Sequence, residues 1–453
     1  MVDHKPELVN FGVHGCVFRP AFQIAPCTNE EIYNKEYGDK KCVSKLFYQS
    51  SDLDAPKRAR PSDVYDDEDD ENSDREDFLV RLKNNNSFDR EIEINVLIDR
   101  LIDPCHHFTP RLISICNSFP VTKEIKAILE SCACPIDGNR SLLYHIKYED
   151  VGLNMKLICR EWFHENVFIH NFAIHLESLF YGIAELEKHG MVHMDIKPDN
   201  ILFDREGKRG TLIDFEKMTC FKSVYRERNI FHFRHARAEF IYYPPEFIIF
   251  LSFLQSAMKH TNPTLLPYAH ELFIRLKMRY HYDINWENEI NKRQDDFIQK
   301  IERCIDDKEQ KRCWKEILGQ FDEVRGHYSS RMCDLESFFF DKEIPDMIEH
   351  ACGKEKQMKI IKYWFHFYAA SKIDVFSLGM VLRECIAEYI YMYLDKMEPN
   401  SHKIHFNFVC FLKFWMKHLI FPMIEIDPVK RMSSREAYQT YNTLKQKYRA
   451  RFL

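Results

Sequence analysis

The chain has 453 residues, of which 45% are hydrophobic, and a formal net charge of −6. A chain of this length and composition can bury a large core, which suits two or three domains or one two-lobed domain with insertions. The negative charge is concentrated in residues 63–77, which hold ten Asp or Glu and one Arg, so the rest of the chain carries +3. A nearly neutral body offers no broad basic surface, so nucleic acid is not the expected partner, and a localised basic patch is the alternative.

The cysteines and the apolar runs bear on where the protein resides. The fifteen cysteines are odd in number and include no Cys-x-x-Cys pair, and the closest two, Cys132 and Cys134, lack metal-site spacing. This pattern favours a reduced, intracellular and cytoplasmic protein over a disulfide scaffold. The longest apolar run, residues 247–254, is too short to span a bilayer. We expect neither a signal peptide nor a membrane anchor.

A small β-rich region is predicted at the start of the chain. Residues 42–48 alternate between apolar and polar and then become apolar, as a strand does. Residues 49–87 turn to Asp, Ser, Asn, Pro and basic residues, a composition that cannot form a core and predicts a disordered insertion. A short basic run in this insertion has a second interpretation, as a signal for nuclear import or for binding an anionic partner. Its cations are Lys57, Arg58 and Arg60.

The later part of the chain is predicted to be mainly helical. Apolar residues spaced by three and four predict helices over residues 89–102, 167–186 and 373–390, with more helices toward the C-terminus. The second of these is expected to be one long, buried helix that delivers the chain to His193. A β-rich region followed by a larger helical region makes the expected fold class α+β.

Residues 247–373 form a long segment of mixed charge, with 20 Lys or Arg and 20 Asp or Glu. Helical stretches such as 297–305 and 314–324 predict a charged helical insertion. Mixed charge usually marks an exposed helical face, which favours a solvated elaboration packed on the large helical region. The alternative is a docking surface for a substrate or a regulator.

The motif with the clearest chemistry spans residues 193–200, His-Met-Asp-Ile-Lys-Pro-Asp-Asn, and Asp214-Phe215 follows fourteen positions later. The order resembles the catalytic and metal-binding loops of protein kinases. In such enzymes an ATP γ-phosphoryl group leaves only when its charge is neutralised and the acceptor oxygen is aimed in line, and short oxygen ligands on a loop hold the metal that this requires. The resemblance implies ATP and Mg²⁺ as cofactors, Asp195 as the base, Lys197 at the γ-phosphate, and Asn200 and Asp214 as metal ligands.

Other features of the same family occur nearer the N-terminus. The segment 10–17 is similar to the glycine-rich phosphate loop, where glycine lets backbone amides approach an anion. Lys45 stands at the place of the family's strand Lys, which binds the α- and β-phosphates and pairs with a helix carboxylate. Glu93 fits that partner best by spacing, and Glu91 is the rival, because the insertion at 49–87 prevents spacing from deciding between them.

A segment resembling the family's adenine-binding hinge lies at residues 148–152, Tyr-Glu-Asp-Val-Gly. It implies a kinase N-lobe at residues 1–147 and a kinase C-lobe at 148–453. The residues that the resemblance assigns to nucleotide binding are Gly12, Val13, His14, Gly15, Val17, Lys45, Glu149 and Val151.

Three further matches favour a protein kinase over the lipid and small-molecule kinases. Pro-Pro-Glu at 244–246 resembles the family's Ala-Pro-Glu, whose Glu246 is expected to pair with Arg431 in Asp-Pro-Val-Lys-Arg. Asp374 begins a segment similar to the family's Asp-Val-Trp-Ser-Leu-Gly, and it is expected to support the catalytic-loop backbone. Lys197, two residues after Asp195, resembles the Ser/Thr-directed class.

Three positions depart from the family pattern. Met194 replaces the Arg that would bind a phosphorylated activation loop, so we do not expect loop phosphorylation to control activity. Glu216 replaces the Gly after Asp-Phe, and Glu239 replaces a Thr that contacts the catalytic loop. Such departures resemble those of divergent kinases, including kinases of large DNA viruses. The expected function is phosphoryl transfer from ATP to Ser/Thr of protein substrates, and the alternative is a pseudokinase that binds nucleotide or acts as a scaffold.

Overall fold

The structure, a computed structural model, describes residues 7–11, 15–19, 21, 30–32, 42–47, 87–120, 122–131, 142–165, 167–204, 206–221, 242–259, 266–279, 285–349, 353–397 and 406–452. The predicted disordered insertion lies outside these residues except for Ser87, which begins a helix, and its basic run lies outside them, as do Gly12, Val13, His14 and Glu239. The chain divides into two compact units, Met1–Gly152 with Thr211–Glu216, and Leu153–Gly210 with Lys217–Leu453. Two short elements carry residues of both units, β10 (Gly210–Leu212) and the 3₁₀ turn η5 (Phe215–Lys217).

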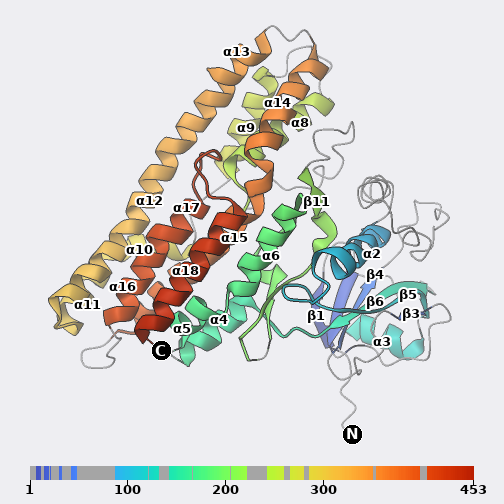
Figure 1. The fold of residues 1–453 in the computed structure, drawn as a ribbon, viewed down its shortest axis with the longest axis horizontal. Helices are drawn as coiled ribbons and strands as arrows, with labels where there is room; N and C mark the ends of the chain where they lie inside the picture. The colour runs from blue at the N-terminus through green and yellow to red at the C-terminus, as the bar shows by residue number, and fades with distance from the viewer. Residues whose placement is uncertain are drawn as a thin grey trace. The chain divides into compact units, whose positions relative to one another are not determined.

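The first unit contains a six-stranded antiparallel sheet with the order β1-β2-β4-β6-β5-β3 (Figure 1). The strand predicted at 42–48 is confirmed as β4, over Cys42–Phe47. The other strands are β1 (Glu7–Phe11), β2 (Gly15–Arg19), β3 (Glu30–Ile32), β5 (Leu112–Pro120) and β6 (Leu142–Glu149). The helices that the described residues of this unit form are α2 (Ser87–Leu97), which continues into the π-helical turn η3 (Ile98–Ile102), and α3 (Lys123–Ser131).

The core of the first unit forms where α2 packs on the sheet. Ile92 and Val96 stand one helical turn apart and are buried with Leu112, Ile115 and Ile146 from β5 and β6. Full burial of each such side chain contributes about 1.5–3 kcal/mol. The helix predicted at 89–102 is therefore confirmed, and its apolar stripe is the face that holds it against the sheet.

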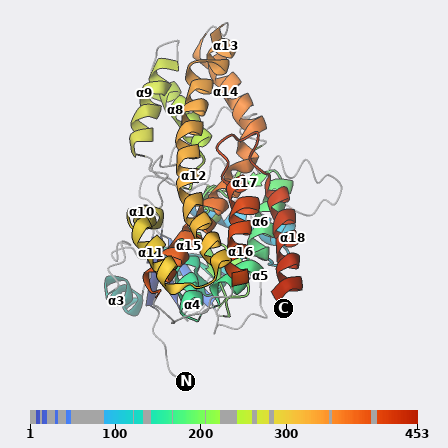
Figure 2. The ribbon, with the colours of Figure 1, turned by 90° about the vertical axis from the view of Figure 1, so that its left-hand side faces the viewer.

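The second unit is mainly helical, and its helices pack in pairs (Figures 1 and 2). Contacts join α6 to α18, α8 to α9 and α14, α10 to α15, and α12 to α16. The helices are α4 (Met155–His164), α5 (Phe168–Ile174), α6 (Glu177–Lys188), α8 (Pro245–Lys259), α9 (Leu266–Arg279), α10 (Asn285–Lys292), α11 (Gln294–Cys304), α12 (Lys308–Phe340), α13 (Glu343–Glu349), α14 (Lys354–Tyr368), α15 (Ile373–Asp395), α16 (Phe406–Trp415), α17 (Phe421–Met423) and α18 (Ser434–Phe452).

Short strands accompany these helices. β7 (Leu153–Asn154) pairs with β9 (Ile201–Phe203), and β8 (Met191–Val192) pairs with β11 (Thr219–Cys220), both antiparallel. The 3₁₀ turn η4 (Pro198–Asn200) lies between β8 and β9. A small strand-rich region with a larger helical part confirms the mixed α+β class.

The helix predicted over 167–186 is two helices. α5 ends at Ile174 and α6 begins at Glu177. The last hydrogen bond of α5 runs from the His175 N–H to the Asn171 carbonyl oxygen. Neither Gly nor Pro marks the break, and apolar spacing continues through Leu176, which is fully buried. The apolar stripe alone therefore could not reveal the break. The helix predicted at 373–390 is confirmed as α15, which runs on to Asp395.

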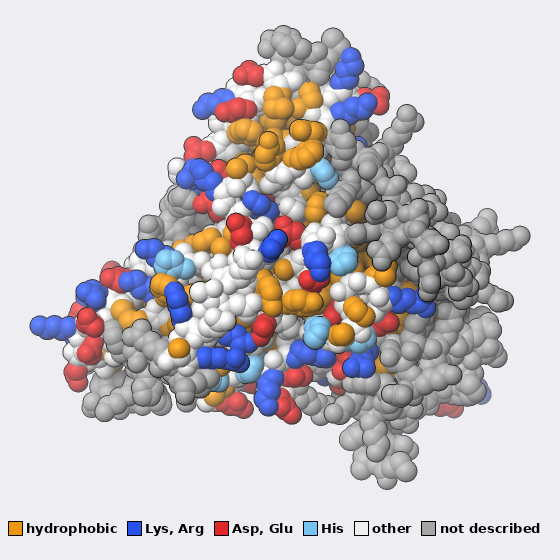
Figure 3. All heavy atoms as spheres, viewed as in Figure 1, with side chains coloured by type: hydrophobic (Ala, Val, Ile, Leu, Met, Phe, Trp, Pro, Cys, Tyr) orange, Lys and Arg blue, Asp and Glu red, His pale blue; other side chains and the backbone are white. Residues whose placement is uncertain are grey.

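The helical character of residues 247–373 is confirmed, since α8 to α14 lie in this segment. Its first helix is largely buried, and Glu287 of α10 forms a buried ion pair with Arg383 of α15. The exposed large apolar side chains of this segment include Ile274 of α9, Met347 of α13 and, on α14, Tyr363, Phe367 and Tyr368. Figure 3 shows hydrophobic side chains gathered around these helices.

Among the described residues, no helix combines the length and the hydropathy that crossing a bilayer requires. Cys116 on β5 is disulfide-bonded, whereas Cys42, Cys313 and Cys410 are free thiols. The sequence favoured a reduced protein over a disulfide scaffold; Cys116 departs from that prediction, and the free thiols agree with it. Spacing along the sequence does not reveal which cysteines meet in space.

Candidate active site

The ammonium of Lys45, on β4 in the first unit, is bound by two carboxylates. Its Nζ lies 2.8 and 2.7 Å from Oε1 and Oε2 of Glu91 on α2, and 3.1 Å from Oδ1 of Asp214. The expectation that Glu93 is the partner is therefore wrong, and the rival Glu91 takes that place. Side chains two positions apart on a helix point to different faces. In α2 the side chain of Glu91 is buried, whereas that of Glu93 is less buried.

Two other side chains fix Glu91, and sequence reasoning missed both in this role. The Tyr148 hydroxyl donates to Glu91 Oε1 at 3.0 Å. Asn95 Nδ2 donates to the Glu91 carbonyl oxygen at 2.7 Å and lies 3.2 Å from the Tyr148 hydroxyl. Tyr148 of β6 stands opposite Val43 of β4. Val43 lies two positions before Lys45 on β4, so the side chains of Tyr148 and Lys45 lie on the same face of the sheet. Only the strand register reveals this neighbour, and spacing along the chain does not.

Three carboxylates surround this one ammonium. Oxygens of Glu91, Asp214 and Glu216 lie within 4.8 Å of one another. Burial raises the pKa of Glu91 to about 7; Lys45 lowers it, but repulsion from Asp214 and Glu216 adds to the rise. Burial opposes the charge of Lys45, yet attraction to Asp214 and Glu91 outweighs it and raises the pKa of Lys45 above its usual range. Carboxylate oxygens in excess of cations are the donor set that Mg²⁺ prefers.

The predicted hinge residues are held by contacts within the first unit. The Glu149 N–H donates to the Arg111 carbonyl oxygen at 3.0 Å, so this amide does not serve adenine. Asp150 accepts from the Gly152 N–H at 3.0 Å and binds Arg19 at 2.6 Å, which fixes the turn at Gly152, where φ is 102°. Val151 is buried.

The predicted phosphate loop is described only at its edges. β1 and β2 form an antiparallel pair on either side of residues 12–14, and Gly15 begins β2. Val17 stands opposite Lys45 in the register of β2 and β4. The assignment of Gly12, Val13 and His14 to nucleotide binding stays a prediction.

The second unit brings Asp195, Lys197 and Asn200 together. The Asp195 carboxylate is 3% exposed, and its Oδ2 accepts from Lys197 Nζ at 3.2 Å and from Asn200 Nδ2 at 3.0 Å. Asn200 Nδ2 also donates to the Asp195 carbonyl oxygen at 2.9 Å, which closes the loop on itself. A cation not singled out from the sequence, Lys217, lies 2.6 Å from Oδ1 of Asp195.

The backbone of this loop is held from behind by Asp374, as expected. The two carboxylate oxygens of Asp374 accept from the N–H groups of His193 at 2.6 Å and Met194 at 3.1 Å. His193 Nδ1 accepts from the Asp195 N–H at 3.2 Å. Tyr243, which sequence reasoning did not place here, donates its hydroxyl to the Met194 carbonyl oxygen at 3.0 Å. A buried carboxylate, an imidazole and a phenol thus fix the approach to Asp195.

Strained backbone marks both predicted loops. Met194 has a φ of 67° and Asp214 a φ of 64°, in the left-handed region that non-glycine residues rarely adopt. Each such residue costs on the order of 1–3 kcal/mol, which surrounding contacts must offset. At Met194 those contacts come from Asp374 and Tyr243. Strain of this kind clusters at functional sites, and here it stands directly beside Asp195.

The expected ion pair between Glu246 and Arg431 is confirmed. Glu246, in the first turn of α8, meets the Arg431 guanidinium in a two-pronged contact of 2.5 and 3.0 Å, and both side chains are fully buried. Arg431 also donates to the carbonyl oxygens of Glu425 and Ile426. This pair ties α8 to the turn before α18 and belongs to the core of the second unit.

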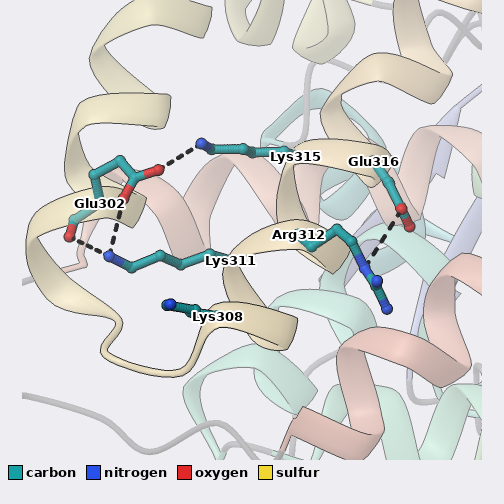
Figure 4. A pocket seen from close by; sticks show the side chains of 6 residues that line it. All are labelled: Glu302, Lys308, Lys311, Arg312, Lys315 and Glu316. Carbon is teal, nitrogen blue, oxygen red and sulfur yellow. Dashed lines mark hydrogen bonds and ion pairs between the residues drawn. The ribbon is translucent and has the colours of Figure 1, made fainter.

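A polar hollow at the start of α12 is a weaker candidate (Figure 4). Glu302 lies 2.9 Å from Lys311 and 2.5 Å from Lys315, and Arg312 lies 3.8 Å from Glu316. Hydrogen bonds from Lys315 and Lys311 lower the pKa of Glu302 to about 2. Carboxylates of the protein itself therefore already compensate these cations, and we assign no ligand to the hollow.

No family model and no curated protein matches the chain. The geometry must therefore carry the functional argument. One group of residues joins the half-buried Lys45 ammonium to two carboxylates, with the Glu216 carboxylate beside them, and another presents a buried carboxylate between two lysines. The first can bind a polyphosphate and a hard cation, and the second can accept a proton from a hydroxyl.

Proposed function

We propose that this chain is an ATP- and Mg²⁺-dependent protein kinase that acts on Ser or Thr of protein substrates. The observation that carries the proposal is the buried Asp195 carboxylate, which Lys197 and Asn200 hold on a loop whose amides bind Asp374. A carboxylate fixed in this way is suited to take the proton of an acceptor hydroxyl. A lysine beside it neutralises charge on the transferred group.

In the proposed reaction the acceptor oxygen bonds to the γ-phosphorus while the bond to the β–γ bridging oxygen breaks. Asp195 takes the hydroxyl proton, and ADP leaves. Lys45, oriented by Glu91, would bind the α- and β-phosphates. Mg²⁺, held by Asn200 and Asp214, would neutralise the charge that develops on the phosphate oxygens.

A pseudokinase is the second candidate, and one contact favours it. Lys217 lies 2.6 Å from the oxygen of Asp195 that a hydroxyl would need. Met194 and Glu216 also depart from the kinase pattern. Against this reading stands the joint presence of Lys45, Asp195, Asn200 and Asp214, since a module without turnover has no chemical need for the base.

Phosphoryl transfer from ³²P-labelled ATP tests the proposal directly. We expect wild-type protein with Mg²⁺ to label generic protein substrates or itself, and Asp195→Asn to lose at least a hundredfold in rate, because the amide cannot accept the proton. Glu206→Gln makes the same acid-to-amide change on an exposed turn of the same unit and is expected to label at the wild-type rate. Equal labelling by wild type and Asp195→Asn would refute the kinase assignment, and no labelling by either would support the pseudokinase.

The proposed partners are protein substrates, with no membrane involved. Residues 247–373 would provide any docking surface for them. We propose an intracellular, cytoplasmic site of action, with nuclear import through Lys57, Arg58 and Arg60 as the alternative. Replacing those three cations by Ala in a localisation assay separates the two.

A further inference from the structure

Among the described residues, Lys217 is the cation nearest to the proposed base, and the proposed reaction leaves it without a role. It ends the turn η5, and its Nζ lies 2.6 Å from Asp195 Oδ1, closer than Lys197 Nζ lies to Oδ2, at 3.2 Å. The Lys217 side chain is 42% exposed, whereas Asp195 is 3% exposed. One end of this contact is therefore buried in the loop, and the other end is partly exposed.

The two oxygens of Asp195 differ in how they are occupied. Oδ2 accepts from both Lys197 and Asn200, and two donors fill the two lone pairs of a carboxylate oxygen. Oδ1 accepts from Lys217, so its second lone pair is the place where a hydroxyl can donate. An acceptor hydroxyl bound there shares its oxygen with the Lys217 ammonium.

This sharing gives Lys217 an influence over which acceptors can bind. A neutral or basic neighbour of the acceptor residue leaves the ammonium on Oδ1, where it holds one lone pair and crowds the hydroxyl at the other. An acidic neighbour offers the ammonium another partner of the same charge and chemistry as Asp195. Because Lys217 is long, flexible and partly exposed, its head can turn toward such a partner without disturbing the buried loop.

We propose that Lys217 makes this protein selective for Ser or Thr flanked by Asp or Glu, because the acidic side chain draws the ammonium from Asp195 Oδ1 to itself. The inference rests on the proposed function. Lys217 is a specificity residue in this scheme, and Asp195 remains the base. Acidic protein segments are thus the substrate class.

A matched set of peptides tests the inference. Three peptides carry one Ser flanked by Glu, by Gln or by Lys, and kcat/KM is measured with wild type, Lys217→Gln and Lys217→Arg. We expect wild type to favour the Glu peptide over the Gln peptide by about tenfold in kcat/KM, which corresponds to about 1.4 kcal/mol. We expect Lys217→Gln to reduce that ratio to within twofold and Lys217→Arg to keep it. Lys208→Gln removes an exposed cation of the same unit and should leave the ratio unchanged.

A binding measurement keeps the test independent of turnover. Fluorescence anisotropy with Glu- and Gln-flanked peptides that carry Ala in place of Ser gives Kd for each variant, and Lys217→Ser serves if Lys217→Gln does not fold. An unchanged Glu-to-Gln ratio after either substitution, in kcat/KM or in Kd, overturns the selectivity. If Asp195→Asn is inactive while that ratio is unchanged, only this inference fails. If Asp195→Asn transfers phosphate as well as wild type does, the proposed function fails, and the Kd values still decide the role of Lys217.

Discussion

At the scale of single residues, the cluster around Lys45 holds more negative than positive charge. Glu91 is the carboxylate that takes up a proton most readily, because burial and the nearby Asp214 and Glu216 raise its pKa to about 7 despite Lys45. The excess has a functional reading, since a divalent cation brought by a nucleotide would relieve it. In the protein alone it has a consequence for stability.

We expect the stability of the protein without metal to fall as pH rises from about 4.5 to about 7, in part through Glu91. The folded state keeps the Glu91 proton up to a higher pH than the unfolded state does, so in this window folding holds an extra proton and rising pH favours unfolding. Urea unfolding from pH 4 to 8, in the presence of a chelator, measures the slope.

The variant Glu91→Gln is neutral at every pH and should flatten this slope. Glu130→Gln on α3 makes the same change at a carboxylate that is 64% exposed, and it should keep the wild-type slope. Parallel pH curves for wild type and Glu91→Gln would show that Glu91 ionises normally.

At the scale of elements, the contact of Arg431 with Glu246 joins α8 to the turn before α18. Arg431→Ala leaves a carboxylate buried without its cation, together with the carbonyl oxygens of Glu425 and Ile426 that the guanidinium binds. We expect a loss of about 3–5 kcal/mol in the free energy of unfolding. The neighbouring Lys430→Ala removes a cation that is 58% exposed, and it should cost less than about 1 kcal/mol. Similar losses in the two variants would contradict this account.

A second link between elements joins α12 to α16. The sulfur atoms of Cys313 and Cys410 lie 3.0 Å apart in the reduced form. We expect oxidised glutathione to join them, the two thiols losing two protons and two electrons as it becomes two reduced glutathione molecules. Non-reducing peptide mapping should find a Cys313–Cys410 peptide that is absent from Cys313→Ala. Cys333, exposed on the same helix, offers a comparison thiol, and its preferential oxidation would contradict the expectation.

These elements also mark what the sequence could foretell. Strand β4, helix α2 and helix α15 follow from local periodicity, and the pairing of Glu246 with Arg431 followed from a family pattern. The choice of Glu91 over Glu93 as the partner of Lys45 did not follow from either, because it depends on which face of α2 is turned toward the sheet. The contacts of Tyr148 and Lys217 depend on strand register and on a turn after Asp214, which residue spacing does not encode.

At the scale of the whole molecule, residues 247–373 decide how the second unit is built. A solvated elaboration would add exposed helices to a core complete without them. The described part of the segment instead supplies core residues, since Phe247, Phe250 and Leu251 of α8 are buried, and Glu287 of α10 meets Arg383 of α15 in a buried ion pair. We infer that the segment is part of the core of the second unit.

We therefore expect a chain that lacks residues 266–349 to lose the cooperative unfolding of its second unit. The deletion removes α9 to α13 and with them Glu287, the carboxylate that meets Arg383 of α15 in a buried ion pair. Glu287→Gln tests that ion pair alone and should cost about 3–5 kcal/mol, whereas Lys308→Ala, at an exposed position of α12, should cost less than about 1 kcal/mol. Calorimetry and near-ultraviolet circular dichroism distinguish the outcomes. A deleted chain that melts in one sharp transition at the wild-type temperature would mean that the segment is a separable appendage, and that its exposed apolar side chains serve docking alone.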